Sequence, residues 1–404
     1  MKNAIKAITD TFGIQISKKQ FNKHLDGFVS MKPRGQVKGN VLLAYIIDPF
    51  LLKPGENIPN THTHFWESKQ IAQTFLDMGF TVDAISYHNT KFKPTKEYSF
   101  FISARTNFQK IAELLDEDCI KIVNLDMAHW IPNNFAAYHR CYNVYKRRKV
   151  TIRNYKLQEE NFAIEHADYA TVLGNTFTMD TYKYANKPLF RVPLPTCVTY
   201  PWFEDKDYNS NRKNYLWFGS RGFLHKGLDL VLEAFSQMPE YNLTVCGPIE
   251  KEKDFEREYY NELYNTQNIH TIGWIDIESQ KFQDILKSCV GIVYPSCCEG
   301  GGGSVLTCMQ GGLIPIVSYE TSVDIKDNYG VMLEDSSTDE IKKAVQHVSG
   351  LSELKIKEMS YSAWEFARAN HTKETFIKNY RDVIEEILTL EKEKKFNEGR
   401  MLIS

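Results

Sequence analysis

The sequence lacks the features that mark a membrane-spanning, exported or nucleic-acid-binding protein. Its 404 residues carry 49 Lys or Arg and 51 Asp or Glu, so no positive excess favours a nucleic acid as the main partner. The longest apolar run, 41–52, is too short to span a bilayer and contains Asp48. The N-terminal sequence has no apolar segment of the signal-peptide kind. These absences predict a soluble, cytoplasmic protein with no nucleic-acid partner.

The cysteines also exclude several classes of protein. The eight cysteines are spread along the chain without a C-x-x-C pair, which excludes a zinc ribbon and a thioredoxin-like redox motif. They favour reduced thiols in the cytoplasm. His62 and His64 stand two residues apart in a predicted loop, but no clear third ligand accompanies them. We therefore expect no bound metal.

What is present is the composition of an ordinary globular protein, with 42% hydrophobic and 25% charged residues. Continuous apolar strands alternate with helices in two series, which is typical of parallel sheets covered on both faces. The sequence therefore predicts two tandem Rossmann-like doubly wound α/β domains. The predicted parts are an N-terminal extension over 1–40, a first domain over 41–200, a linker over 201–213, a second domain over 214–372 and a C-terminal helix over 373–404.

Both ends of the chain leave alternatives open. The extension 1–40 holds eight Lys or Arg and two Asp, and Ile5, Ile8 and Phe12 share one helical face. It makes a peripheral contact with an anionic membrane, or it packs on the first domain or is partly disordered. The C-terminal helix either crosses back to the first domain or ends in solvent. Within the first domain, two helices are predicted over roughly 133–166.

Three motifs of the second domain follow predicted strands, where a doubly wound sheet places its ligands. The first runs from Gly219 and Ser220 to Arg221 and Lys226, just before a helix. Two cations beside the positive end of a helix favour an anion such as a diphosphate. The alternative is that both are surface side chains around a loop.

The second motif places a carboxylate before a glycine run, between a strand and a helix that starts near Ser304. Glu299 is followed by four glycines: Gly300, Gly301, Gly302 and Gly303. Glycines expose backbone N–H groups and adopt positive φ, so such a loop can wrap a phosphate. The carboxylate can accept several hydrogen bonds from sugar hydroxyls. The motif lacks G-K-[ST] and is not a P-loop; a flexible turn is the alternative.

The third motif, Gly273, Trp274 and Ile275, follows another predicted strand. Its backbone can read the edge of a base while Trp274 lies against the face of that base. The alternative places Trp274 in the core.

Together these motifs resemble the C-terminal domain of GT-B glycosyltransferases of family 4, the glycosyl transferases group 1. The family pattern G-R-x4-K-G corresponds to Gly219, Arg221, Lys226 and Gly227, with Ser220 before the Arg. The pattern P-S-x-x-E-G-x-G is present over 295–302. The family's second Glu, eight residues after the first, falls at Thr307, which can make one hydrogen bond but cannot hold two ribose hydroxyls as a carboxylate does.

The resemblance implies a role for each matching residue. Arg221 and Lys226 would neutralise the donor diphosphate with help from the amides of 301–304, and Glu299 would bind the donor sugar. No metal is then required. His129 follows a strand where the family often has a His that faces the donor sugar, although a purely structural His is the alternative. The predicted acceptor side comprises Asn60, His62, His64, Gly174 and Asn175.

The resemblance implies a glycosyltransferase that moves a sugar from a nucleotide-diphosphate donor to a glycan or lipid-linked acceptor, such as a cell-surface glycan or glycolipid precursor, and retains the anomeric configuration. Two other GT-B activities are alternatives, a nucleotide-sugar epimerase and a sugar phosphorylase. A non-catalytic partner or glycan-binding module is a third alternative, and Thr307 is its support.

Overall fold

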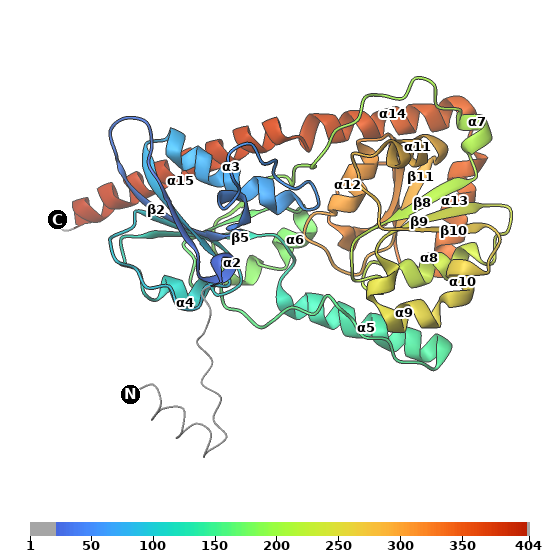
Figure 1. Ribbon diagram of the computed structural model, residues 1–404, viewed down its shortest axis with the longest axis horizontal. Helices are drawn as coiled ribbons and strands as arrows, with labels where there is room; N and C mark the ends of the chain where they lie inside the picture. Colours follow the sequence, from blue (N-terminus) through green and yellow to red (C-terminus); the bar gives the residue numbers. More distant parts are fainter. Residues whose placement is uncertain (1–21, 402–404) are drawn as a thin grey trace, which may run out of the picture.

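The computed structural model describes residues 22–401, which form two α/β domains (Figure 1). The first domain has a seven-stranded sheet in the order β1-β3-β2-β4-β5-β6-β7, in which only the edge strand β1 is antiparallel to its neighbour. Its strands are β1 (Phe28–Met31), β2 (Gly39–Tyr45), β3 (Phe80–Ser86), β4 (Phe100–Ala104), β5 (Ile120–Leu125), β6 (Tyr169–Val172) and β7 (Leu189–Arg191). β3, β4 and β6 are buried along their whole length, because helices and loops cover both faces of the sheet.

The helices of the first domain are α2 (Lys23–Asp26), α3 (Thr63–Asp77), α4 (Phe108–Ala112), α5 (Trp130–Arg148) and α6 (Thr176–Asp180). α3 begins where the His62 side chain accepts a hydrogen bond from the backbone of His64. It ends before Gly79, whose φ of 94° reverses the chain toward β3. α5 is 19 residues long, and its C-terminal end reaches the second domain (Figure 1).

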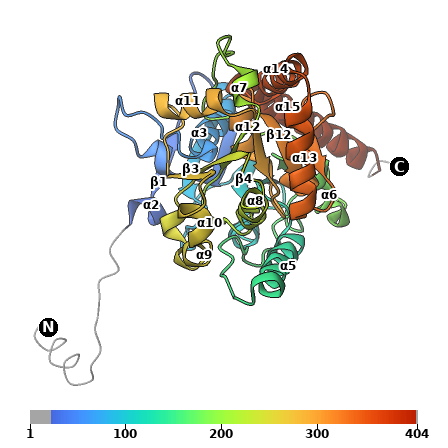
Figure 2. The ribbon, with the colours of Figure 1, turned by 90° about the vertical axis from the view of Figure 1, so that its right-hand side faces the viewer.

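The second domain has a fully parallel six-stranded sheet in the order β10-β9-β8-β11-β12-β13. Its strands are β8 (Asn214–Phe218), β9 (Asn242–Cys246), β10 (Ile269–Gly273), β11 (Gly291–Tyr294), β12 (Ile314–Ser318) and β13 (Val331–Leu333). Its helices are α8 (Leu228–Phe235), α9 (Lys253–Glu258), α10 (Tyr260–Tyr264), α11 (Gln280–Ser288), α12 (Gly303–Met309) and α13 (Thr338–Gly350). Figure 2 shows α11 on one side of this sheet and α9 and α10 on the other. The strand order is that of a Rossmann fold, and it reverses direction between β8 and β11.

The last two helices connect the domains. α14 (Glu353–Asn370) packs on the second domain, and α15 (Lys373–Met401) runs back along the first (Figure 1). The Phe376 ring meets the edge of Trp66 on α3, and Glu391 accepts a hydrogen bond from the Tyr169 hydroxyl at 2.7 Å. These contacts confirm the prediction of a C-terminal helix that crosses back to the first domain.

The predicted linker 201–213 contains the short helix α7 (Tyr208–Asn211) and is anchored rather than loose. The Trp202 ring contacts Tyr361 and Trp364 on α14, and the Tyr208 hydroxyl lies 3.0 Å from Ser360 Oγ.

Two local predictions differ from the structure. The segment 1–40 is not wholly separate from the first domain, because residues 28–31 of it form strand β1; the predicted helical face over 5–12 lies outside the described residues. The two helices predicted over 133–166 are one helix, α5, followed by an irregular segment over 149–168. Contacts with the second domain hold this segment in an irregular shape; for example, the Arg153 backbone N–H donates to Asp254 Oδ2 at 2.7 Å.

None of the eight cysteines is paired in a disulfide. Among residues 22–401, no helix combines the length and the apolar character needed to cross a bilayer.

Candidate functional site

The site lies where β8 and β11 are neighbours, at the point where the strand order of the second sheet reverses. The loop after β8 and the loop after β11 therefore leave the same edge of the sheet side by side. Gly227, with φ of 73°, marks their contact: a Cβ at this position would lie 2.4 Å from the Pro295 carbonyl oxygen. The structure thus brings together two of the three motifs.

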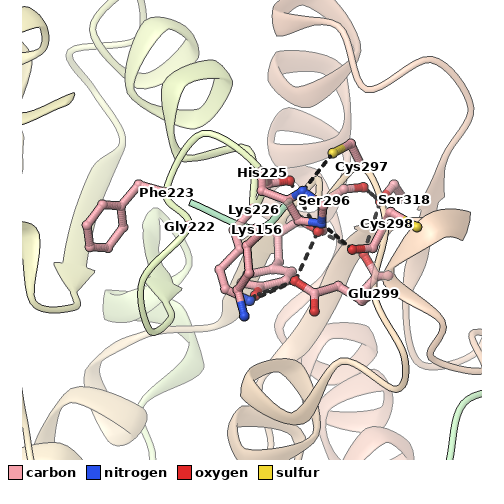
Figure 3. A network of polar contacts seen from close by, with 12 residues as sticks. Lys156, Gly222, Phe223, His225, Lys226, Ser296, Cys297, Cys298, Glu299 and Ser318 are labelled. Atoms are coloured by element: carbon pink, nitrogen blue, oxygen red, sulfur yellow. Dashed lines mark hydrogen bonds and ion pairs between the residues drawn. The ribbon is translucent and has the colours of Figure 1, made fainter. Parts of the chain in front are cut away.

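The centre of the site is a buried ion pair. Lys226 Nζ lies 2.7 Å from Glu299 Oε1, and the Lys226 ammonium also donates to the Tyr294 hydroxyl at 2.8 Å (Figure 3). Ser296 Oγ donates to the same carboxylate oxygen at 3.1 Å. Burial opposes ionisation of Glu299, but the charge of Lys226 prevails and lowers the pKa of this carboxyl to about 2. Both groups are therefore charged at neutral pH.

A second lysine, which the motifs did not reveal, comes from the first domain. Lys156 lies in the irregular segment after α5, and Figure 3 shows it beside Lys226. The positive charge of Lys226, together with burial, lowers the pKa of Lys156 to about 8. The Lys156 stem lies against Gly222, in the loop that carries Lys226.

Arg221 does not join this pair. Its side chain is 52% exposed, and its guanidinium lies over the Tyr155 ring at 4.8 Å from the ring centre. Its nearest carboxylate is Glu252, at 4.0 Å. Glu252 instead accepts hydrogen bonds from the backbone N–H groups of Gly222 and Phe223 and so shapes the loop. Of the two predicted cations, only Lys226 points into the site; Ser220 is exposed and Gly219 is buried.

The structure explains why residues 300–302 are glycines, which the sequence did not suggest. A Cβ on Gly300 would lie 2.1 Å from the backbone oxygen of Asp126, so glycine permits contact between the two domains. Gly301 and Gly302 have φ of 147° and 57°, which other residues rarely adopt. Gly303 and Ser304 begin α12.

Thr307 lies on α12, one turn beyond the glycine run. It is 7% exposed, and its Oγ1 donates to the Gly303 carbonyl at 2.8 Å. This intrahelical bond satisfies its hydroxyl in the absence of a ligand.

The third motif leaves Trp274 61% exposed, so the alternative that placed it in the core is wrong. Gly273 has φ of 83°, and the position of a Cβ on it is open. Ile275 is buried. From the first domain, Asn60 Nδ2 donates to Asp276 Oδ1 at 3.4 Å, so the predicted acceptor loop reaches the residue that follows this motif.

His62 and His64 lie at the start of α3, on the first-domain side of the site. His64 stands between two carboxylates, with Nδ1 2.6 Å from Glu67 and Nε2 3.4 Å from Asp126. Burial lowers the pKa of His62, and the charges of His64, Lys156 and Lys226 lower it further. Among residues 22–401, no group of three His, Cys, Asp or Glu is arranged to hold a metal ion.

His129 has a structural role in this arrangement. Its Nδ1 accepts from the backbone of Ile131 at the start of α5, and its Nε2 lies 3.0 Å from the Tyr184 hydroxyl. Burial lowers its pKa, so the ring is neutral and both nitrogens are occupied. The expectation that His129 faces the donor sugar stays a prediction.

Gly174 and Asn175 lie between β6 and α6, where the first domain meets the second. The Asn175 backbone N–H donates to Ser322 Oγ at 3.0 Å, and a Cβ on Gly174 would meet the same hydroxyl at 2.5 Å. These residues form a contact between the domains, and their place on the acceptor side stays a prediction.

A cavity of about 440 Å³ opens at the carboxyl ends of β3, β4 and β5. Arg105, Lys110, Met127, Lys156 and Gln158 are among its lining residues. Lys156 therefore borders both this cavity and the Lys226–Glu299 pair.

Residues 202–360 match the family described as Glycosyl transferases group 1. The match spans most of the second domain and includes all three of its motifs. No curated protein sequence matches the chain.

Solved structures share the two-domain GT-B fold at low sequence identity. A sucrose-phosphate synthase from Thermosynechococcus elongatus has 12% identity and a TM-score of 0.61 over 87% of this chain and 100% of that one. HepE from Anabaena, solved in complex with UDP and glucose, has 10% identity and a TM-score of 0.52 over 87% and 99%. TarM from S. aureus, solved with fondaparinux, alpha-GlcNAc-glycerol and UDP, has 13% identity and a TM-score of 0.51 over 70% of this chain and 54% of TarM. This chain thus spans about half the length of TarM.

Proposed function

We propose that the protein is a glycosyltransferase that moves a sugar from a nucleoside-diphosphate donor to an acceptor hydroxyl in the cleft between its domains. The observation that carries the proposal is the buried pair of Lys226 and Glu299. A glycosyl transferases group 1 domain holds this pair at the reversal point of its sheet, the usual position for a nucleotide phosphate.

The donor would bind across the motifs of the second domain. The diphosphate of the donor would lie beside Lys226. Arg221, whose exposed guanidinium lies over the Tyr155 ring, would turn toward the diphosphate. Cations in this position stabilise the negative charge that grows on the leaving diphosphate. Glu299 would accept hydrogen bonds from the sugar hydroxyls, and the exposed ring of Trp274 would stack on the base.

The acceptor would enter through the 440 Å³ cavity of the first domain, since Lys156 separates this cavity from the donor site. Its oxygen would attack the anomeric carbon from the side of the departing diphosphate, and the acceptor proton would pass to a diphosphate oxygen. This path retains the anomeric configuration. It needs no metal, because protein cations and backbone amides balance the charge of the leaving group. Closure of the domains would exclude water and so limit hydrolysis.

The acceptor class that fits a cytoplasmic enzyme of this family is a cell-surface glycan or a glycolipid precursor. The enzyme would work at the inner face of the membrane if the basic segment 1–40 contacts anionic lipid.

A second candidate is a non-catalytic GT-B partner or glycan-binding module, which Thr307 favours because a threonine cannot hold two ribose hydroxyls. The intact Lys226–Glu299 pair favours the enzyme.

The products of a single incubation distinguish these functions. The protein is incubated with UDP-, GDP-, ADP- and TDP-sugars and a set of oligosaccharide and glycolipid acceptors, and products are analysed by mass spectrometry. A free nucleoside diphosphate with an extended acceptor supports the transferase. An isomerised nucleotide sugar indicates an epimerase, a sugar phosphate a phosphorylase, and no product with any donor the non-catalytic module. Lys226→Met should lower transfer by about 100-fold or more, whereas Lys146→Met, an exposed lysine on α5, should leave it unchanged.

A further inference from the structure

The segment that carries Lys156 is fixed in place although it has no regular structure. The backbone N–H of Lys156 donates to Asn154 Oδ1 at 2.9 Å, and its carbonyl accepts from Asn133 Nδ2 at 2.9 Å. Both asparagines are buried in the first domain. The first domain thus presents this lysine to the second in a defined position.

The side chain of Lys156 lies against the first motif of the second domain. A Cβ on Gly222 would be 2.5 Å from Lys156 Cγ, so this glycine leaves room for the lysine stem. The Lys156 ammonium has no hydrogen-bond or ion-pair partner in the part of the chain that the structure describes. It is a partly buried cation directed at the donor site (Figure 3).

The charge balance of the site indicates a role for the Lys156 ammonium. The charges of Lys226 and Glu299 cancel within their ion pair, and Arg221 points outward. A nucleoside diphosphate carries two to three negative charges. Without Lys156, the pair alone would offer it no net positive charge, and electrostatic attraction would be weak.

We propose that Lys156 binds the diphosphate of the donor, so that the first domain adds an unpaired cation to the site of the second domain. This inference rests on the proposed function. It follows that tight donor binding requires the two domains to be in contact, since Lys156 leaves the site when they separate. The interdomain contact at Gly300 and the donor would then stabilise the same arrangement.

Titration calorimetry with UDP, GDP, ADP, TDP and CDP tests the inference. The proteins compared are the wild type, Lys156→Met, Lys156→Arg and the surface control Lys146→Met. For the nucleotide that the wild type binds best, Lys156→Met should weaken binding by about tenfold or more, because a charge-assisted contact is lost. Lys156→Arg should recover most of the affinity, and Lys146→Met should match the wild type.

The outcomes separate this inference from the proposed function. If the wild type binds one nucleotide and Lys156→Met binds it equally well, the role of Lys156 is overturned while the donor site stands. If the wild type binds none of the five nucleotides, both the proposed function and the role of Lys156 are overturned. Equal thermal unfolding midpoints for wild type and Lys156→Met show that weaker binding does not come from misfolding. If Lys156→Arg is as weak as Lys156→Met, the requirement is not for charge and the inference is overturned.

Discussion

Lys226 Nζ and Glu299 Oε1 are 2.7 Å apart and come from loops 73 positions apart in the chain. They meet because β8 and β11 are neighbours at the reversal point of the second sheet. The strand order therefore turns two separate motifs into one charged centre.

Removing one member of this pair should destabilise the fold. Lys226→Met leaves the Glu299 carboxylate buried without its cation, and loss of one partner from a buried pair costs about 3–5 kcal/mol. The double variant Lys226→Met/Glu299→Gln should recover much of this loss. Chemical denaturation of the four proteins in a double-mutant cycle measures the coupling. Strictly additive effects would show that the two side chains do not interact.

The same pair predicts how stability responds to acid. The pKa of Glu299 is about 2 in the folded protein, below the value of about 4.3 expected in the unfolded chain. A depressed pKa contributes stability above the unfolded value, and this contribution is lost as pH falls from about 4.5 toward 2. The free energy of unfolding of the wild type should decrease more steeply in this window than that of Glu299→Gln. Parallel pH profiles would contradict the assignment.

The threonine at position 307 leads to a prediction about how much the ribose contributes to donor binding. The wild type should bind UDP and 2′-deoxy-UDP with similar affinity, because one hydroxyl contact is the most that Thr307 can offer. Thr307→Glu should favour UDP by about tenfold or more, since a carboxylate can accept from both ribose hydroxyls. If calorimetry shows an unchanged ratio, position 307 does not face the ribose.

The lowered pKa of Lys156 predicts that nucleotide binding depends on pH. Its pKa is about 8 without a ligand, and a bound diphosphate should raise it. Binding should therefore take up a proton and weaken as pH rises above about 8. The charged or titratable groups that face Lys156 are Lys226, Glu299, Arg105, Glu252 and His62. Calorimetry at pH 8.5 in buffers of different ionisation enthalpy should detect the uptake in the wild type but not in Lys156→Met.

The parts of the fold that the sequence predicted are those with strong local signals. β2, β8 and β11 contain uninterrupted apolar runs, because each is buried from both faces of a parallel sheet. β5 is mostly apolar but also carries Lys121 and Asn124. The edge strand β1 is four residues long and partly exposed, so its sequence pattern is weak.

The site was predictable only where a motif is local. Lys226 and Glu299 follow strands and precede helices, a context that the sequence shows directly. The position of Lys156 depends on contacts with Asn133 and Gly222 from distant segments. Arg221 likewise points outward because Tyr155, from the other domain, receives its guanidinium. No local pattern encodes such contacts between domains.

The most direct test of the account is the thermal stability of the protein with each of the five nucleoside diphosphates. A ligand at about 100 times its dissociation constant stabilises a protein by about 2.7 kcal/mol. We predict that one nucleotide raises the unfolding midpoint of the wild type and of Lys146→Met but not that of Lys226→Met/Glu299→Gln. No rise with any of the five, or an equal rise in the double variant, would contradict a donor site at Lys226 and Glu299.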